Sequence, residues 1–141
     1  MAQWVLTRLE EQDYAVPVGD VVEVLRVVAL TPLPDSPAWV LGILNLRGRS
    51  VPVLDLRRRL GLTPIEVGLD AAIVVVEDSG KTVGLLVDEV AEVVDIDDNS
   101  LEPPTGSGQG LKAITHLGSR TILLLDLPHL LDLPGRVTPW T

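Results

Sequence analysis

The chain alternates short apolar runs with polar or glycine-containing turns, which is the pattern of an all-β protein. Strands are predicted over residues 4–9, 14–18, 42–46, 50–56, 71–77, 82–87, 90–96, 113–117 and 121–127. Residues 20–28 combine helical spacing with a high content of β-branched residues, and they are predicted as one turn leading into a strand. Short helices are expected at 57–62 and 127–133, with a helical turn at 37–40.

Two blocks of the sequence occur twice in the same order. Residues 42–56 align without a gap with residues 113–127, an offset of 71, and this alignment matches Arg49 with Arg120 and Asp55 with Asp126. Residues 18–24 align with 87–93 at an offset of 69. Because charged positions match as well as apolar ones, the repeat indicates a duplication. It predicts two pseudo-symmetric β-units whose hairpins curl into small barrels.

Composition restricts the class of protein. Hydrophobic residues make up 46% of the chain, which is enough for a buried core, and the formal net charge is −9. A negative field repels phosphate, so we expect no binding to nucleic acid and no membrane insertion. Cysteine is absent, and no apolar run is long enough for a membrane span. We therefore expect a cytoplasmic protein that is a monomer when isolated.

The residues of known catalytic motifs are missing. The two histidines, His116 and His129, are too few for a histidine metal cage, and no nucleophile elbow is present. Asp95, Asp97 and Asn99 match the first ligand positions of a calcium-binding loop, but Ser100 stands where that loop requires glycine. A metal hydrolase built on this acidic loop is the rival hypothesis. We expect no enzyme activity, no metal and no cofactor.

A cluster of arginines stands out against the acidic background. For Arg57, Arg58 and Arg59 a solvated helix face is expected. Arg47 precedes Gly48 in a tight hairpin, where its guanidinium could be held rigidly and bind a carboxylate with two hydrogen bonds. Arginine is enriched at the energetic centres of interfaces, so Arg47 is a candidate interface residue.

Several longer motifs resemble the CheW-type coupling proteins of bacterial chemotaxis. They are Tyr14-Ala15-Val16-Pro17-Val18, Val21-x-Glu23-Val24, Pro37-Ala38-Trp39-Val40-x-Gly42-Ile43-Leu44-Asn45-Leu46-Arg47-Gly48, Val51-Pro52-Val53-Leu54-Asp55-Leu56-Arg57 and Gly84-Leu85-Leu86-Val87-Asp88. The resemblance covers the chain from about Trp4 to Leu133. Ala113 departs from it, because the family commonly has glycine there.

The resemblance implies an all-β fold of two pseudo-symmetric, five-stranded, SH3-like barrels that share a hydrophobic core, with short helices. Residues 1–133 would form one CheW-like domain, with a first barrel at about 1–66, a second at about 67–133, strands that can interleave, and a tail at 134–141.

The implied function is a non-catalytic adaptor between the cytoplasmic tips of chemoreceptors and the regulatory domain of a CheA-type histidine kinase. Carried over by position, the receptor-binding residues would be Val21, Glu23, Gly42, Arg47 and Gly48. The kinase-binding residues are unassigned and are expected on the second barrel. The alternatives are an equivalent adaptor in a twitching-motility or other chemosensory pathway, and a detached regulatory domain of the kinase. The Met1 start and the short tail favour a free-standing protein.

Overall fold

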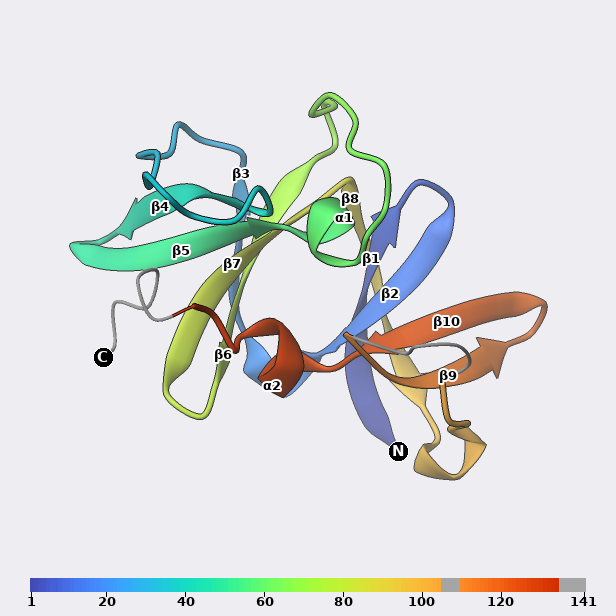
Figure 1. Cartoon of the computed structure of the whole chain (residues 1–141). Helices are drawn as coiled ribbons and strands as arrows, with labels where there is room; N and C mark the ends of the chain where they lie inside the picture. The colour runs from blue at the N-terminus through green and yellow to red at the C-terminus, as the bar shows by residue number, and fades with distance from the viewer. Residues whose placement is uncertain (105–109, 135–141) are drawn as a thin grey trace.

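The computed structural model describes residues 1–104 and 110–134, and these form two five-stranded sheets (Figure 1). The expected tail therefore lies, from residue 135 on, outside the described residues. Sheet A has the strand order β8 (Glu89–Ile96), β1 (Ala2–Leu9), β2 (Gln12–Pro17), β10 (Arg120–Leu125) and β9 (Leu111–Leu117). Sheet B has the order β3 (Val21–Arg26), β6 (Ala72–Asp78), β7 (Lys81–Val87), β5 (Arg49–Asp55) and β4 (Val40–Leu46).

The two halves of the chain exchange hairpins. Sheet A contains β1 and β2 from the first repeat and β8, β9 and β10 from the second. Sheet B contains β6 and β7 from the second repeat and β3, β4 and β5 from the first. Each sheet therefore has one parallel pair of strands at the point where the exchanged hairpin joins the other repeat. The pair is β2 with β10 in sheet A and β7 with β5 in sheet B. Neither sheet coincides with the approximate halves 1–66 and 67–133, because the strands interleave.

Equivalent residue pairs in the two sheets are related by the two offsets found in the sequence. Leu124 pairs with Ala15 in sheet A and Val53 pairs with Gly84 in sheet B, and these pairs are related by the offsets 71 and 69. The isolated bridges Thr31 to Ile43 and Glu102 to Ile114 are related by 71 at both positions. Two distinct types of pairing thus recur at the offsets read from the sequence, and the structure confirms the repeat.

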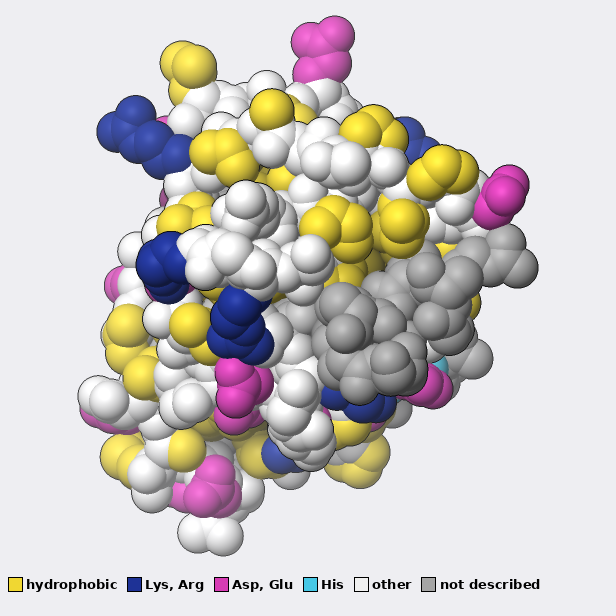
Figure 2. All heavy atoms as spheres, turned by 90° about the vertical axis from the view of Figure 1, so that its left-hand side faces the viewer, with side chains coloured by type: hydrophobic (Ala, Val, Ile, Leu, Met, Phe, Trp, Pro, Cys, Tyr) yellow, Lys and Arg dark blue, Asp and Glu magenta, His cyan; other side chains and the backbone are white. Residues whose placement is uncertain are grey.

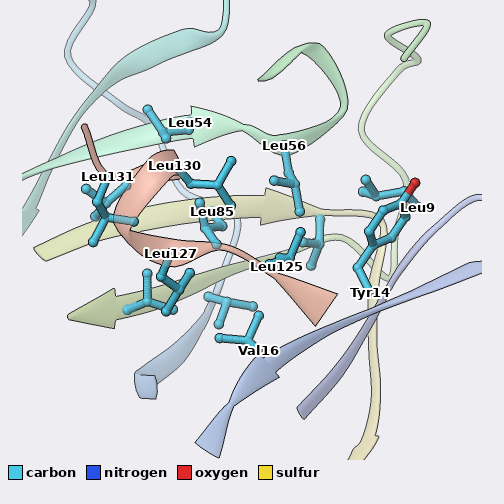
Figure 3. Packing of buried hydrophobic residues seen from close by; sticks show 14 of the residues in the cluster. Leu9, Tyr14, Val16, Leu54, Leu56, Leu85, Leu125, Leu127, Leu130 and Leu131 are labelled. Atoms are coloured by element: carbon cyan, nitrogen blue, oxygen red, sulfur yellow. The ribbon is translucent and has the colours of Figure 1, made fainter. Parts of the chain in front are cut away.

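The main core lies between the two sheets and receives side chains from both. Leu54 and Leu85 come from sheet B, whereas Val16 and Leu125 come from sheet A (Figure 3). Each sheet also has one smaller apolar cluster of its own, around Leu6 and Ile122 in sheet A and around Val51 and Ile73 in sheet B. The shared core makes the sheets one packed unit, as expected for a fold with one common hydrophobic interior.

Two short helices follow the equivalent strands β5 and β10. They are α1 (Leu56–Arg59) and α2 (Leu127–Leu130), and the preceding aspartates, Asp55 and Asp126, cap their first turns by accepting backbone N–H bonds. The helices are shorter than predicted. The helical turn predicted at 37–40 is wrong: this segment forms non-helical turns, and Val40 already belongs to β4. A 3₁₀ turn (Val18–Asp20) leads into β3, as the ambiguous segment was expected to do.

Candidate functional site

Arg47 occupies a strained position at the tip of the β4–β5 hairpin. The loop has two residues, Arg47 and Gly48, with φ of 51° and 85°, and Leu46 pairs directly with Arg49. Both residues adopt the left-handed backbone conformation. The two-residue hairpin turns whose twist matches that of the flanking strands require this conformation. The Gly48 N–H donates to the Asn45 Oδ1 atom at 2.8 Å, which closes the turn. The equivalent position in the second repeat is Gly118, with φ of 62°, which adopts this conformation without steric cost.

The Arg47 guanidinium binds Glu23 of β3 with two hydrogen bonds. The Nη1 atom lies 3.5 Å from Oε1, and Nη2 donates to Oε2. Strand β3 and strand β4 are the opposite edges of sheet B, so this contact shows that the sheet curls until its edges approach. In the described part of the chain no hydrogen-bonded ladder joins the two edges. The arrangement is a curled sheet of the SH3-like type.

The pair is held in place yet remains open to solvent. The Arg47 side chain is 71% exposed and the Glu23 side chain is 25% exposed. Hydrogen bonding to Arg47 lowers the pKa of Glu23, and the carboxylate in turn raises the pKa of Arg47, so both groups stay charged near neutral pH. Exposed ion pairs contribute little to stability. This pair therefore presents charge in a defined direction more than it supports the fold.

The other receptor-binding candidates take different places. Val21 is half-buried and packs against the main core. Gly42 lies in β4 with φ of 150°, and a Cβ atom there would lie 2.5 Å from the Thr31 carbonyl oxygen. The structure thus brings Glu23, Arg47 and Gly48 together at the surface, whereas Val21 and Gly42 face the packed interior beside them.

Two valines of β3 were missed as candidates. Val22 and Val24 alternate with Val21 and Glu23 along the strand, and their side chains are exposed. The period-2 alternation of β3 is the signal that could have found them, because it places them on the outward face. Hydrophobic side chains also reach the surface on the β4–β5 side of the molecule, with basic and acidic side chains between them (Figure 2).

The second repeat carries a different arginine network. Arg120 donates to Asp13 Oδ2 at 2.8 Å and to Glu92 Oε1 at 2.8 Å. Glu92 aligns with Glu23, but its partner Arg120 aligns with Arg49, which donates to Thr82 instead. Each sheet thus carries an Arg–Glu pair, Arg47 with Glu23 in sheet B and Arg120 with Glu92 in sheet A, although the two arginines come from different positions in the repeat.

Arg57 is buried, so the predicted solvated helix face is wrong at this residue. Its side chain is 4% exposed, and it donates to Asp88 Oδ1 at 2.9 Å, to Glu10 Oε1 at 3.2 Å and to the Thr63 carbonyl oxygen at 2.9 Å. Asp88 also accepts from the Glu10 N–H at 2.7 Å. The three charged residues join α1, the β1–β2 turn and the link between β7 and β8. We call them the Arg57 network.

The Arg57 network, which joins residues of both repeats, has no counterpart at the equivalent positions. The positions that align with Arg57, Asp88 and Glu10 are Pro128, Gly19 and Ser79. None of these carries a charge, so the network breaks the pseudo-symmetry of the fold. Of its neighbours, Arg58 is exposed and pairs with Asp55 at 3.3 Å, whereas Arg59 stacks 4.9 Å from the Trp39 ring centroid.

The Arg57 network predicts a specific pH dependence of stability. Hydrogen bonding to Arg57 lowers the pKa of Asp88 below its ordinary value of 3.8. The stabilisation is fully present above the unfolded pKa and is lost as the pH falls through the lowered folded pKa. We expect the Asp88→Asn variant to be less stable than the wild type at neutral pH, with the gap closing in strong acid. Urea unfolding at a series of pH values measures the difference in the free energy of unfolding between the two proteins. A difference that stays constant down to about pH 2 would contradict the prediction.

Residues that could hold a metal do not gather in the described ranges. Within 1–104 and 110–134, no group of three His, Asp or Glu side chains lies close enough to bind an ion. His116, the histidine within a strand, lies 3.6 Å from Glu102 and hydrogen-bonds Thr121. Across the same ranges, no helix is long and apolar enough to cross a membrane.

A family model described as the CheW-like domain matches residues 3–134. The chain belongs to the CheW family. A probable chemotaxis protein CheW from Rhizobium etli is 33% identical over 128 residues, which cover 87% of this chain and 83% of that protein. Protein PilI from Pseudomonas aeruginosa is 37% identical over 83 residues, which cover 59% of this chain and 47% of PilI.

A solved CheW structure has the same architecture. The scaffolding protein TtCheW from Thermoanaerobacter tengcongensis aligns with a TM-score of 0.87 and 34% identity, over 98% of this chain and 92% of that chain. The likeness to this CheW scaffold extends over both curled sheets. It confirms the all-β, SH3-like, two-unit fold expected from the resemblance, including the short helices.

Proposed function

We propose that this chain is a non-catalytic adaptor that couples the cytoplasmic tips of chemoreceptors to a CheA-type histidine kinase. Its membership of the CheW family and its likeness to a protein described as a scaffold support this role. The adaptor works in the cytoplasm, where both partners present the relevant domains. It uses neither a metal nor a cofactor.

The observation that carries the proposal is the exposed, oriented guanidinium of Arg47. A non-glycine residue in the left-handed region carries a backbone cost that the equivalent Gly118 avoids. In contrast to glycine, Arg47 presents an exposed guanidinium at this turn, and its hydrogen bonds to Glu23 fix the direction of that group. Other residues that are not glycine share this backbone conformation, namely Glu10, Asp35 and Ser79. The feature that distinguishes Arg47 is therefore its exposed guanidinium, which Glu23 orients. Arg47 and Glu23 therefore form the charged part of the receptor contact.

The apolar part of the receptor contact lies beside this pair. Val22 and Val24 on the outward face of β3 supply apolar area, while Val21 and Gly42 hold β3 and β4 in place and Gly48 permits the turn. A surface with apolar area and one oriented charge pair is typical of specific interfaces. We place the kinase contact on the opposite unit, sheet A, which leaves both partners free to bind at once.

Replacing Arg47 with alanine should weaken receptor binding without harming the fold. The variant removes an exposed guanidinium at the centre of the proposed contact, and loss of such an arginine commonly weakens binding about tenfold or more. Titration of a purified receptor cytoplasmic fragment against the full chain measures the dissociation constant. The melting temperature should be unchanged, because the side chain is exposed.

Lys112→Ala is the matched control, since it removes one exposed positive charge from sheet A. It should leave the dissociation constant for the receptor fragment unchanged. If Arg47→Ala binds the fragment as tightly as the wild type, the proposed receptor surface is wrong. If both variants weaken binding equally, net charge rather than the Arg47 position is responsible.

A second candidate is the same adaptor role in a twitching-motility pathway, favoured by the similarity to PilI. A detached regulatory domain of the kinase is a further alternative. Co-purification of native partners separates them: flagellar receptors with a kinase support the first proposal, pilus-associated receptors support the second, and a kinase fragment lacking its own regulatory domain supports the third.

A further inference from the structure

The segment between α1 and β6 has the pattern of a strand but pairs with no strand. In Figure 1 it rises above the two sheets before it enters β6. Within it, Ile65 and Val67 flank Glu66, a spacing of two residues that places both apolar side chains on one side of an extended chain. Residues 68–71 then form a turn that carries Leu69 and Asp70. None of these residues belongs to a helix or a strand.

The segment is anchored at its ends and free in its middle. The Leu62 N–H donates to the Arg57 carbonyl at 2.8 Å, Arg57 binds the Thr63 carbonyl, and the Ala71 N–H donates to the Gly68 carbonyl at 3.3 Å. Residues 65–67 make no backbone hydrogen bond to any other residue in the described part of the chain. Their backbone groups are therefore open for pairing with another chain.

The apolar side chains of the segment are exposed. Ile65 and Val67 are 55% exposed and Leu69 is completely exposed. Hollows lie on both sides. One, of about 440 Å³, is lined by Leu41 and Leu86 beneath the segment, and the other, of about 520 Å³, lies between residues 68–72 and the end of β3. The segment is thus an apolar ridge with space for side chains on either flank.

Most of the charges around this ridge are acidic, although Arg26 lines the second hollow together with Asp70. Glu66 and Asp70 line the first hollow together with Glu89, which pairs with Arg8. The two basic residues of this hollow are also paired, Arg57 with Asp88 and Glu10, and Arg58 with Asp55. Among the described residues no basic side chain lies within ion-pair distance of Glu66 or Asp70. A ligand of this ridge is therefore expected to bring positive charge.

We propose that residues 64–70 form a second docking site, which pairs with an extended segment of a partner protein that alternates apolar and basic residues. The partner adds a short strand along the free backbone of residues 65–67, packs apolar side chains against Ile65 and Val67, and places Lys or Arg near Glu66. An anionic membrane is not the occupant, because the same acidic groups repel it. The second hollow is lined in part by Val24, so this site adjoins the proposed receptor contact.

The test uses an isotope-labelled full chain and two synthetic heptapeptides, one alternating lysine and valine and one alternating glutamate and valine. With the lysine peptide we expect NMR shift changes centred on residues 62–71 and slower hydrogen exchange at the amides of Ile65 and Val67. The glutamate peptide should cause neither change. Equal binding of both peptides, or shift changes centred elsewhere, would overturn the proposal.

Two matched variants make the test quantitative. Val67→Thr should raise the dissociation constant of the lysine peptide roughly five- to tenfold, because it replaces an apolar contact with a hydroxyl group. Val93→Thr alters a valine of sheet A that is equally exposed, at 56%, and should leave the constant unchanged. Equal effects of the two variants would count against the site. Cosedimentation with vesicles of phosphatidylglycerol should show no binding, and membrane binding that Val67→Thr abolishes would replace the peptide as the occupant.

Discussion

Replacing Arg57 with alanine is expected to lower the free energy of unfolding by about 2 to 3 kcal/mol. The guanidinium is almost completely buried, and its removal leaves Asp88 and Glu10 facing each other without a cation. Breaking a buried pair from one side costs about 3 to 5 kcal/mol, and here the value is lower because both carboxylates keep access to water. Urea unfolding of the wild type and the variant measures the difference.

Arg58→Ala is the control for this experiment. The two residues are adjacent and carry the same charge, but Arg58 is exposed and pairs only with Asp55 of its own segment. Its loss should cost less than about 1 kcal/mol. The Arg57→Ala and Asp88→Asn substitutions should also be less than additive, because they remove the same interaction. An Arg57→Ala variant as stable as the wild type would show that the network does not support the fold.

Replacing Gly42 with alanine is expected to cost about 2 to 4 kcal/mol. Two effects combine at this position. The backbone has φ of 150°, which side chains rarely adopt, and the new Cβ atom would lie 2.5 Å from the Thr31 oxygen. Thr31 bridges to Ile43 through two backbone hydrogen bonds, so it cannot move away without breaking the connection between β4 and the preceding loop. Denaturant unfolding measures the loss.

The second repeat provides the matched control for Gly42. Ala113 occupies the equivalent place in β9, where a methyl group is buried and accepted. Ala113→Gly should therefore cost only about 1 kcal/mol, from the lost methyl contact and the more flexible unfolded chain. A Gly42→Ala variant that unfolds like the wild type would contradict this account. Reduced receptor binding by Gly42→Ala should follow from damage to the fold, in contrast to Arg47→Ala, which leaves the fold intact.

The positions of the strands could be predicted from the sequence, because strand formation depends on local alternation and on turn residues. The β4–β5 hairpin illustrates this: apolar runs on either side of Arg47-Gly48 require a tight turn, and the structure has it. The repeat was also visible, because both copies keep the same strand spacing and the same capping residues, Asp55 and Asp126, although their turn residues differ. The helical turn predicted at 37–40 is wrong, because the Trp39 carbonyl accepts a hydrogen bond from the Asp55 N–H of β5 and Val40 already pairs in β4.

Other features depend on which distant segments meet, and the sequence pattern carries no record of that. Nothing in the local pattern indicates that β1 and β2 join the strands of the second repeat, since both repeats offer equivalent hairpins. Likewise, the run of Arg57, Arg58 and Arg59 reads as a solvated face, and only the approach of Asp88 and Glu10 makes Arg57 a buried link.

The candidate site divides in the same way. The rigid Arg47 could be predicted from its own turn, and the family resemblance added Glu23, but their contact depends on the curling of sheet B. The strand pattern and turn chemistry of this protein were thus determined by residues close together in the chain. Its hairpin exchange, its charged networks and the approach of its sheet edges were decided by long-range packing, because burial and ion pairing depend on positions in space rather than on neighbours in sequence.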